Sequence, residues 1–449
     1  MQRRLSVLLV LSVFMLAACQ SSVEEKTLDN GMRIIVKVDN RSPVVVSQIW
    51  YRIGSMDEQP GSTGISHVLE HMMFKGTQKL RPGEFSKIIA RNGGRENAFT
   101  SHNYTAYFQT LEKSRLPVAL ELEADRMQNL VFNEAELKRE VLVVMEERRL
   151  RTEDKPEGML YETFRETAFT THPYGRPIIG SMADLRSLTT TDLSNWYKKW
   201  YSPNNATLVV VGDVDPGEVF ALAKKHFGPV PSRPLAARVI KPEPQQKEAR
   251  RAILKIPAQV PRIMIGFHTP VILGDKQEWE PYALDVLAGV LDGGDSARFS
   301  SRLVREQRIA ASAGAGYDSI ARAPSMFTID ATPFNGRSVE DLEKALIEQI
   351  EEIKKDPVSQ AEIDRVKAQV IASDVYQRDS MFYQGMEIGM LTMSGLDWRI
   401  GDRYVDRINS VTAEQIQKVA NKYLNPENMT TAILYPIRPG EKAGGKRGA

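Results

Sequence analysis

The sequence predicts an α+β protein built from two homologous α/β domains, each with a mostly antiparallel sheet packed against helices. With 449 residues, the chain is longer than a single hydrophobic core usually organises. The stretch 227–251 is rich in proline, polar and basic residues, which is typical of a linker, and it separates two halves of similar length. We therefore expect a first domain at 25–226, a second domain at 252–437 and a polar tail at 438–449.

A match between the two halves supports this duplication. The segment Leu188–Asn205 aligns without gaps to Val411–Asn428, and in both a threonine opens a helical stretch that ends in a proline-containing turn. A weaker match sets His67–His71 against Asp285–Gly289, where the apolar positions persist but the polar residues are gone. We infer a duplicated unit in which only the first copy keeps the chemistry.

The overall charge excludes one class of partner. The formal net charge is +2, from 59 basic and 57 acidic residues, so no broad basic face is implied and nucleic acid is not an expected partner. Hydrophobic residues at 42% and charged residues at 26% are typical of a globular chain rather than a disordered one.

The first residues have the pattern of a targeting segment. Arg3 and Arg4 form a short positive region, and Leu5–Leu16 is an apolar run that is too short to span a bilayer comfortably. The run ends in Leu-Ala-Ala-Cys, which resembles the lipobox of bacterial lipoproteins, although an ordinary secretory signal cleaved nearby would look similar. The resemblance implies a lipoprotein signal peptide within 1–19, cleavage before Cys19 and lipidation of that residue.

Cys19 is the only cysteine in the sequence, so it has no disulfide partner. Several acyl chains on this residue would hold the protein on a membrane stably. Gln20 follows it, which by resemblance favours sorting to the outer membrane. We expect a periplasmic, lipid-anchored protein of a Gram-negative bacterium, with a soluble body.

Two β-branched runs, at 32–38 and 43–53, are separated by a turn at Asp39-Asn40-Arg41 and predict an antiparallel pair of strands. Further along the chain, apolar residues recur at helical spacing and form one face of a helix: Ile65, Val68, Leu69, Met72 and Met73. Ser62 or Thr63 is placed to cap the start of this helix.

The same helix carries His67, Glu70 and His71 on the side away from its apolar face. Histidines four residues apart project from one side about a turn apart, so they can offer two imidazole nitrogens to one zinc ion. The order H-x-x-E-H is that of the inverzincins, in which the carboxylate takes a proton from water activated by the metal. Two histidines at this spacing also occur on solvated helix faces, so a third ligand decides between the interpretations.

A second helix is predicted over 134–151, with Glu140 and Glu147 on one stripe. Together with the histidine motif, it resembles the pitrilysin-type (M16) zinc metallopeptidase family, which includes insulin-degrading enzyme and the mitochondrial processing peptidases. In that family the third zinc ligand is a glutamate at a characteristic spacing beyond the second histidine, and an acidic residue stands seven positions before this glutamate. Here Glu147 lies 76 positions after His71, which is about that spacing, and 7 positions after Glu140.

The resemblance implies a role for each of these residues. One zinc ion per chain would be held by His67, His71 and Glu147. Glu140 would orient a histidine, and Glu70 would be the catalytic base.

The resemblance extends to a pair of strands beside the active site. In relatives the edge strand receives the substrate as an added strand through backbone hydrogen bonds, so its side-chain selectivity is loose. The corresponding substrate-binding residues here are Asn97, Ala98, Phe99 and Thr100. His172–Gly180 also looks like a family segment, and we expect it to be scaffold.

One part of the family pattern is missing. Active members add an arginine and a tyrosine, seven positions apart, from the second domain, and these are thought to hold the substrate and its developing oxyanion. The corresponding arginine is Arg305, but Ser312 stands where the tyrosine is expected. A partner chain could supply the pair, Tyr317 could serve in a distorted strand, or the enzyme could be slow. We favour a homodimer or heterodimer with a same-fold subunit.

We therefore predict a membrane-tethered zinc endopeptidase that hydrolyses peptides or unfolded protein segments. The alternative is a non-catalytic peptide-binding or assembly subunit of the same fold, although family members of that kind usually lose the zinc ligands. A secreted protein that only binds zinc is a third and weaker interpretation.

Overall fold

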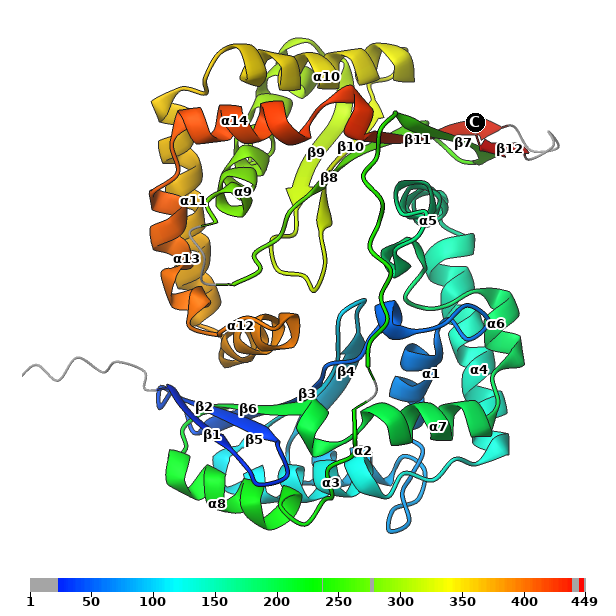
Figure 1. The fold of residues 1–449 in the computed structure, drawn as a ribbon, viewed down its shortest axis with the longest axis vertical. Helices are drawn as coiled ribbons and strands as arrows, with labels where there is room; N and C mark the ends of the chain where they lie inside the picture. The colour runs from blue at the N-terminus through cyan, green and yellow to red at the C-terminus, as the bar shows by residue number, and fades with distance from the viewer. Residues whose placement is uncertain (1–22, 236, 275–277, 438–443, 448–449) are drawn as a thin grey trace, which may run out of the picture.

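The computed structural model describes residues 23–235, 237–274, 278–437 and 444–447. Its strands form two sheets, one from each half of the chain, at opposite ends of the molecule (Figure 1). The predicted signal peptide and Cys19 lie outside the described residues. Within the described residues, no helix is long and apolar enough to cross a membrane.

The first sheet has six strands among the described residues, in the order β1-β2-β6-β3-β5-β4. Their bounds are β1 Val23–Thr27, β2 Arg33–Val38, β3 Val44–Tyr51, β4 Arg95–Thr100, β5 Thr105–Glu112 and β6 Ala206–Gly212. β2 and β6 are parallel, and the other neighbouring pairs are antiparallel. The predicted direct pairing of 32–38 with 43–53 is wrong, because β6 lies between β2 and β3. The apolar strand β6 is buried along its whole length, as suits a central position.

The second sheet repeats this arrangement, with the order β12-β7-β11-β8-β10-β9 in the part of the chain described. Its strands are β7 Arg250–Pro257, β8 Arg262–Thr269, β9 Ala310–Tyr317, β10 Ser325–Pro333, β11 Met429–Ile437 and β12 Gly444–Arg447. β7 and β11 are parallel, and the other neighbours are antiparallel. The predicted fold of two homologous, mostly antiparallel units is confirmed. β12 lies in the segment 438–449, where we expected only a polar tail.

Helices flank both sheets. In the first half they are α1 Ile65–Met72, α2 Glu84–Arg91, α3 Leu116–Gln128, α4 Glu134–Arg148, α5 Pro156–Ala168, α6 Met182–Ser187, α7 Thr190–Trp200 and α8 Pro216–Phe227. In the second half they are α9 Glu280–Leu291, α10 Val339–Lys355, α11 Gln360–Arg378, α12 Met381–Ser394, α13 Ile400–Asn409 and α14 Ala413–Tyr423.

The two matched sequence segments form equivalent elements. Thr189 and Thr412 begin α7 and α14, each through a capping box. A short 3-10 turn follows each helix, Pro203–Asn205 or Pro426–Asn428, and leads into β6 or β11. The duplication inferred from these segments therefore corresponds to a repeated helix, turn and strand.

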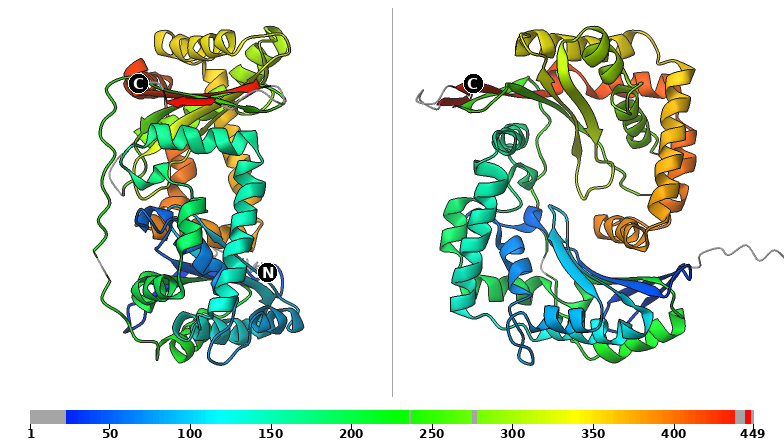
Figure 2. Two further views of the ribbon diagram at one scale, coloured as in Figure 1. Left: turned by 90° about the vertical axis from the view of Figure 1, so that its right-hand side faces the viewer. Right: turned by 180° about the vertical axis from the view of Figure 1, so that it is seen from behind.

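Each sheet is covered on one face by helices of its own half and on the other face by a helix of the opposite half (Figure 1; Figure 2). α5 packs on β7 and β11, and α12 packs on β3 and β6. The approach is close, because a Cβ at Gly266 would lie 2.4 Å from the ring of Phe164, and one at Gly389 would lie 2.0 Å from Trp50. These glycines let the crossing helices pack directly on the sheets.

The passage between the halves lies against the body of the protein. Its described residues between α8 and β7 form no helix or strand. The Glu243 carboxylate in this passage accepts hydrogen bonds from the backbone N–H groups of Thr170, Thr171 and His172, at 3.0, 2.8 and 2.9 Å. The linker is therefore tied to the loop that follows α5.

Candidate metal centre

Helix α1 carries the histidine motif and buries its apolar face in the core of the first half. Its N-cap is Gly64, in the left-handed region at φ +87°, so the expected cap by Ser62 or Thr63 is wrong. The Glu58 carboxylate binds the start of the helix instead. It accepts hydrogen bonds from the backbone N–H groups of Gly64 at 2.8 Å and Ser66 at 2.9 Å.

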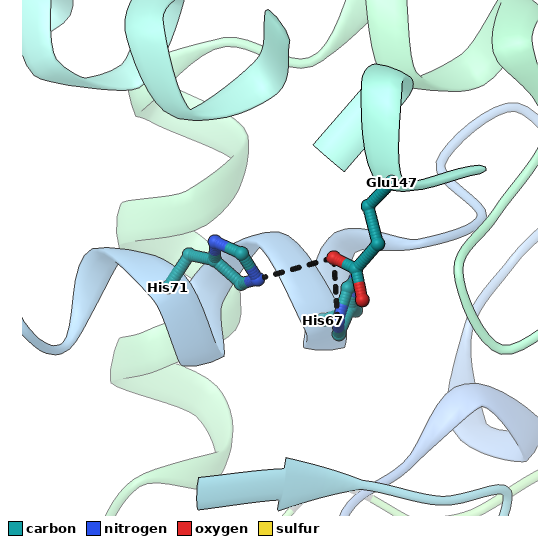
Figure 3. A group of neighbouring side chains, drawn as sticks. All are labelled: His67, His71 and Glu147. Carbon is teal, nitrogen blue, oxygen red and sulfur yellow. Dashed lines mark ion pairs between the residues drawn. The ribbon is translucent and has the colours of Figure 1, made fainter. Parts of the chain in front are cut away.

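His67 and His71 face Glu147 of α4 (Figure 3). His67 Nε2 and His71 Nε2 lie 3.8 and 3.6 Å from Oε2 of Glu147. One ligand atom from each of the three residues lies within 4.8 Å of the others. Across the described ranges, no other group of three or more His, Cys, Asp or Glu side chains is placed to share a metal ion. The structure thus brings together the three side chains that the family resemblance identified as zinc ligands.

Glu140 lies two turns before Glu147 on α4, against the other ring nitrogen of His71. Its Oε2 is 3.2 Å from His71 Nδ1, and its Oε1 is 2.6 Å from Lys75 Nζ. Burial opposes the charge of this carboxylate, but the hydrogen bonds to His71 and Lys75 prevail and lower the pKa of Glu140. A carboxylate at Nδ1 keeps the imidazole proton there and directs the lone pair of Nε2 to the metal position.

This donor set fits zinc. Burial, with smaller effects from His71 and Arg151, lowers the pKa of His67 to about 3, so this imidazole is neutral near pH 7 and its lone pair can bind a metal. Arg151 Nη1 lies 2.7 Å from Oε1 of Glu147 and holds that carboxylate in place. Two histidines and one glutamate form a common set in catalytic zinc sites, which keep a further position open for water or substrate.

Glu70 lies on the same face of α1 as the histidines and reaches the same cavity. The residue is 8% exposed, and the Thr100 hydroxyl on β4 donates a hydrogen bond to its Oε2. Burial raises the pKa of Glu70, although the hydrogen bond from Thr100 opposes this effect. A carboxylate in this position can exchange protons with water held near the metal ligands.

Strand β4 borders the cavity, which has a volume of about 760 Å³ and is lined by Asn97, Ala98, Phe99 and Thr100 together with the metal ligands. β4 is the edge strand next to β5. Ser101 N–H donates to the Tyr104 carbonyl at 2.8 Å, and antiparallel alternation from this bond turns the N–H and C=O of Ala98 toward the free edge. The Ala98 N–H is held by Oδ1 of Asn97 at 2.9 Å. The edge can therefore accept a further strand once Asn97 moves aside.

Arg305 does not reach this cavity. It is exposed, and its Nη2 donates to the carbonyl of Asp295 at 2.5 Å. The Tyr317 hydroxyl donates to the carbonyl of Pro270, and Ser312 is paired within the second sheet on β9. The oxyanion role expected for Arg305, and the substitute role considered for Tyr317, are therefore not supplied to the metal centre within this chain.

Part of the cavity wall was missed by the sequence analysis. α5 contributes Tyr161 and Arg165, and the segment Gly175–Ile179, expected to be scaffold, contributes Arg176. Each is a single polar residue without a spacing motif, so no local pattern separates it from ordinary surface residues. Tertiary packing alone brings these side chains next to α1.

Two known families match the chain in consecutive segments. The family described as Insulinase (Peptidase family M16) matches residues 33–182, which include the metal centre. The family described as Peptidase M16 inactive domain matches residues 187–370. These matches agree with a duplicated fold whose first copy carries the metal ligands.

Whole-chain relatives carry zinc protease names. Zinc protease PqqE of Helicobacter pylori is 33% identical over 419 residues, covering 92% of this chain and 93% of that protein. An uncharacterized zinc protease of Mycobacterium leprae is 29% identical over 432 residues, covering 94% of this chain and 93% of that protein. The crystal structure of a protease from Helicobacter pylori has a TM-score of 0.87 and 32% identity, covering 93% of this chain and 100% of that chain. The chain therefore belongs to peptidase family M16.

Proposed function

We propose that the protein is a zinc-dependent endopeptidase that hydrolyses peptides or unfolded protein segments. The observation that carries this proposal is the convergence of His67, His71 and Glu147 within 4.8 Å, with Glu70 beside them in one cavity. The zinc proteases among the relatives support it. Because β4 would recognise the peptide backbone, extended and unfolded segments are favoured over folded proteins.

Each residue has a defined task in hydrolysis. A zinc ion bound by His67, His71 and Glu147 would supply Lewis acidity, which polarises a carbonyl and promotes loss of a proton from water. Glu70 accepts the proton that the attacking water loses and then delivers it to the departing amine nitrogen. The edge of β4 holds the extended peptide by backbone hydrogen bonds, and Glu140 fixes the ring of His71.

A second chain of the same fold completes the site in this proposal. The support is that Arg305 donates to a carbonyl of its own half and that the Tyr317 hydroxyl is used at Pro270. Donors for the developing oxyanion would then come from a same-fold subunit; a heterodimer can supply a complete arginine and tyrosine pair, whereas the second copy in a homodimer also has Ser312 in place of the tyrosine. Assaying the chain alone and with candidate paralogues tests this, and full activity of the lone chain would remove the need for a partner.

We also propose that the protein is a periplasmic lipoprotein, anchored at the outer membrane through Cys19. The support is the N-terminal sequence, with its short apolar run before Cys19 and with Gln20 after it. A Cys19→Ser variant is expected to lose acyl labelling and to leave the membrane fraction. Labelling that persists in this variant would contradict the anchor.

A non-catalytic peptide-binding subunit is the second candidate. Its support is that residues 187–370 match the Peptidase M16 inactive domain and that the second half has no described group of metal-binding side chains. The first half keeps the full set of ligands, which favours the peptidase. Zinc content separates the two candidates, since a binding subunit need not hold stoichiometric metal.

The decisive experiment combines metal analysis with cleavage of an unfolded fluorogenic peptide, with and without chelator. Glu70→Gln is expected to keep one zinc per chain and lose hydrolysis, whereas His67→Ala should lose both. Glu121→Gln, on the exposed side of α3, is the matched control and should retain both. Hydrolysis by the Glu70→Gln variant, or absence of zinc from the wild type, would overturn the proposal.

A further inference from the structure

Two arginines in the wall of the active-site cavity have no carboxylate partner. Arg165 lies on α5, Arg176 lies in the loop before α6, and both line the cavity together with the metal ligands. Within the described ranges, neither guanidinium has a carboxylate oxygen within 4.0 Å. Arg165 Nε donates to the Tyr174 carbonyl at 3.0 Å, and Arg176 Nη1 donates to the Glu58 carbonyl at 2.8 Å. Each guanidinium has five N–H donors, so most of them remain for a ligand.

The environment of Arg165 makes an unpaired charge costly. Its guanidinium lies over the rings of Phe169 and Tyr174, at 4.6 and 5.6 Å, and burial lowers its pKa. Asp318 acts on it electrostatically but lies beyond ion-pair distance. Arg165 is half-buried, and a cation withdrawn from water usually has a hydrogen-bonded counter-charge, which neither the aromatic rings nor one backbone carbonyl provides.

Both arginines act electrostatically on His172, which lies behind the residues that line the cavity. Burial, together with the charges of Arg165, Arg176 and Arg322, lowers the pKa of His172 to about 4, although Glu243 opposes this effect. Both guanidinium groups therefore lie within electrostatic reach of one imidazole, which stays neutral near pH 7.

The acidic residue that α5 contributes to this wall is already neutralised. Glu162 accepts two hydrogen bonds from Arg148, at 2.7 and 3.0 Å. Arg148 therefore compensates the charge of Glu162, and this carboxylate does not neutralise Arg165 or Arg176. This part of the cavity keeps an excess of positive charge.

We propose that Arg165 and Arg176 bind a carboxylate of the peptide substrate. This inference rests on the proposed peptidase function and names its substrate class: peptides that place an acidic side chain, or their own C-terminal carboxylate, in the cavity. The planar guanidinium offers paired N–H donors that match a carboxylate. Because β4 binds backbone without regard to side chains, these arginines would set the sequence preference.

The test compares peptides that carry glutamate, glutamine or lysine at each position around the cleavage site, made both as free acids and as C-terminal amides. With the zinc-loaded full chain, kcat/KM is expected to be about tenfold higher for glutamate than for glutamine at one position, as for loss of one charged hydrogen bond. Faster cleavage of free acids than of amides with equal side chains would assign the carboxylate to the peptide terminus. Equal values for all peptides would overturn the inference.

Substitutions in the wall identify the residues responsible. Arg165→Gln and Arg176→Gln are each expected to bring the preference for the carboxylate down to a ratio of about one. Arg186→Gln changes an exposed arginine of α6 outside the cavity and should keep the wild-type ratio. Zinc content reports whether each variant folds, and Arg176→Gln serves alone if Arg165→Gln does not. A wild-type ratio in the variants that fold would overturn the inference.

A binding measurement separates this inference from the proposed function. The same labelled peptides are titrated against zinc-loaded Glu70→Gln protein, with fluorescence anisotropy as the readout. Failure of the wild type to cleave any peptide, both alone and with same-fold partner chains, would count against the peptidase itself. Binding or cleavage without a preference for the carboxylate would contradict the proposed role of the arginines without contradicting the peptidase function.

Discussion

Asp57 and Arg322 form a bidentate ion pair that joins the two halves of the chain in the protein interior. Arg322 Nη1 donates to Asp57 Oδ2 at 2.7 Å, and Nη2 donates to Oδ1 at 2.9 Å. The side chain of Arg322 is 4% exposed and that of Asp57 is 1% exposed. The pair therefore contributes to the relative placement of the halves around the active-site cavity.

The Arg322→Met variant is expected to lose about 3 kcal/mol of unfolding free energy, because it leaves the buried Asp57 carboxylate without its main partner. Denaturant unfolding followed by circular dichroism measures this. Lys418→Met is the control: it removes a surface pair with Glu414, in which the side chains of Lys418 and Glu414 are 60% and 72% exposed, and it should leave the unfolding free energy nearly unchanged. Equal losses in both variants would contradict the prediction.

Glu140→Ala is expected to weaken zinc binding by about 10- to 100-fold, because His71 Nδ1 loses the acceptor that orients its ring. Competition with a chromogenic chelator measures the affinity. The matched control is Glu136→Ala on the same helix, whose carboxylate pairs with Arg139 instead. An unchanged zinc affinity in the Glu140 variant would show that His71 is oriented by other contacts.

Ala98→Pro is expected to raise KM for unfolded peptides about five- to tenfold, since it removes an N–H at the free edge of β4. Edge positions tolerate proline, so the melting temperature should change little. Phe99→Pro provides the contrast, because the N–H of Phe99 faces β5 and its loss should lower the melting temperature. A wild-type KM in the Ala98 variant would argue against strand addition.

Asp39 is expected to contribute to stability at mildly acidic pH. Hydrogen bonds from Arg41, with a smaller one from Gln384, prevail over burial and lower the pKa of Asp39 from 3.8 to about 2. Because the folded pKa is depressed, this contribution is complete above the unfolded value and is lost as pH falls from 3.8 toward about 2.

Asp39→Asn should therefore lower the melting temperature near neutral pH and narrow the difference from the wild type as pH falls through this range. Asp364→Asn, at an exposed position of α11, is the control and should show a difference that is small at every pH. Melting curves recorded across the acidic range check both variants. A difference in melting temperature between the wild type and the Asp39 variant that stays constant as pH falls would contradict the lowered pKa of Asp39.

The metal ligands could be predicted because α-helical geometry relates residue spacing to direction. His67 and His71 share a side of α1 at a spacing of four, and Glu140 and Glu147 share a stripe of α4. Nothing in helix geometry relates α1 to α4, however, so the assignment of Glu147 depended on a family spacing. The structure supplies the missing relation by packing α4 against α1.

The order of the strands in the first sheet could not be predicted from local sequence patterns. The runs that became β2 and β3 are adjacent in sequence and look like a hairpin, but β6 from the end of the first half pairs with both. Arg165 and Arg176 were missed for the same physical reason, since long-range packing brings isolated residues into one cavity wall. The helix cap by Glu58 is also a contact across a loop rather than a neighbouring residue.

Because α5 and α12 each pack on the sheet of the opposite half, neither half is expected to fold as an independent domain. The first half alone would expose an apolar surface on its sheet, made by Ile35, Trp50, Ala106, Val209 and Val211, and α5 would have no sheet to cover. Proteolytic cleavage in the linker should therefore give two fragments that remain associated. Both halves of the chain must be synthesised before either can finish folding.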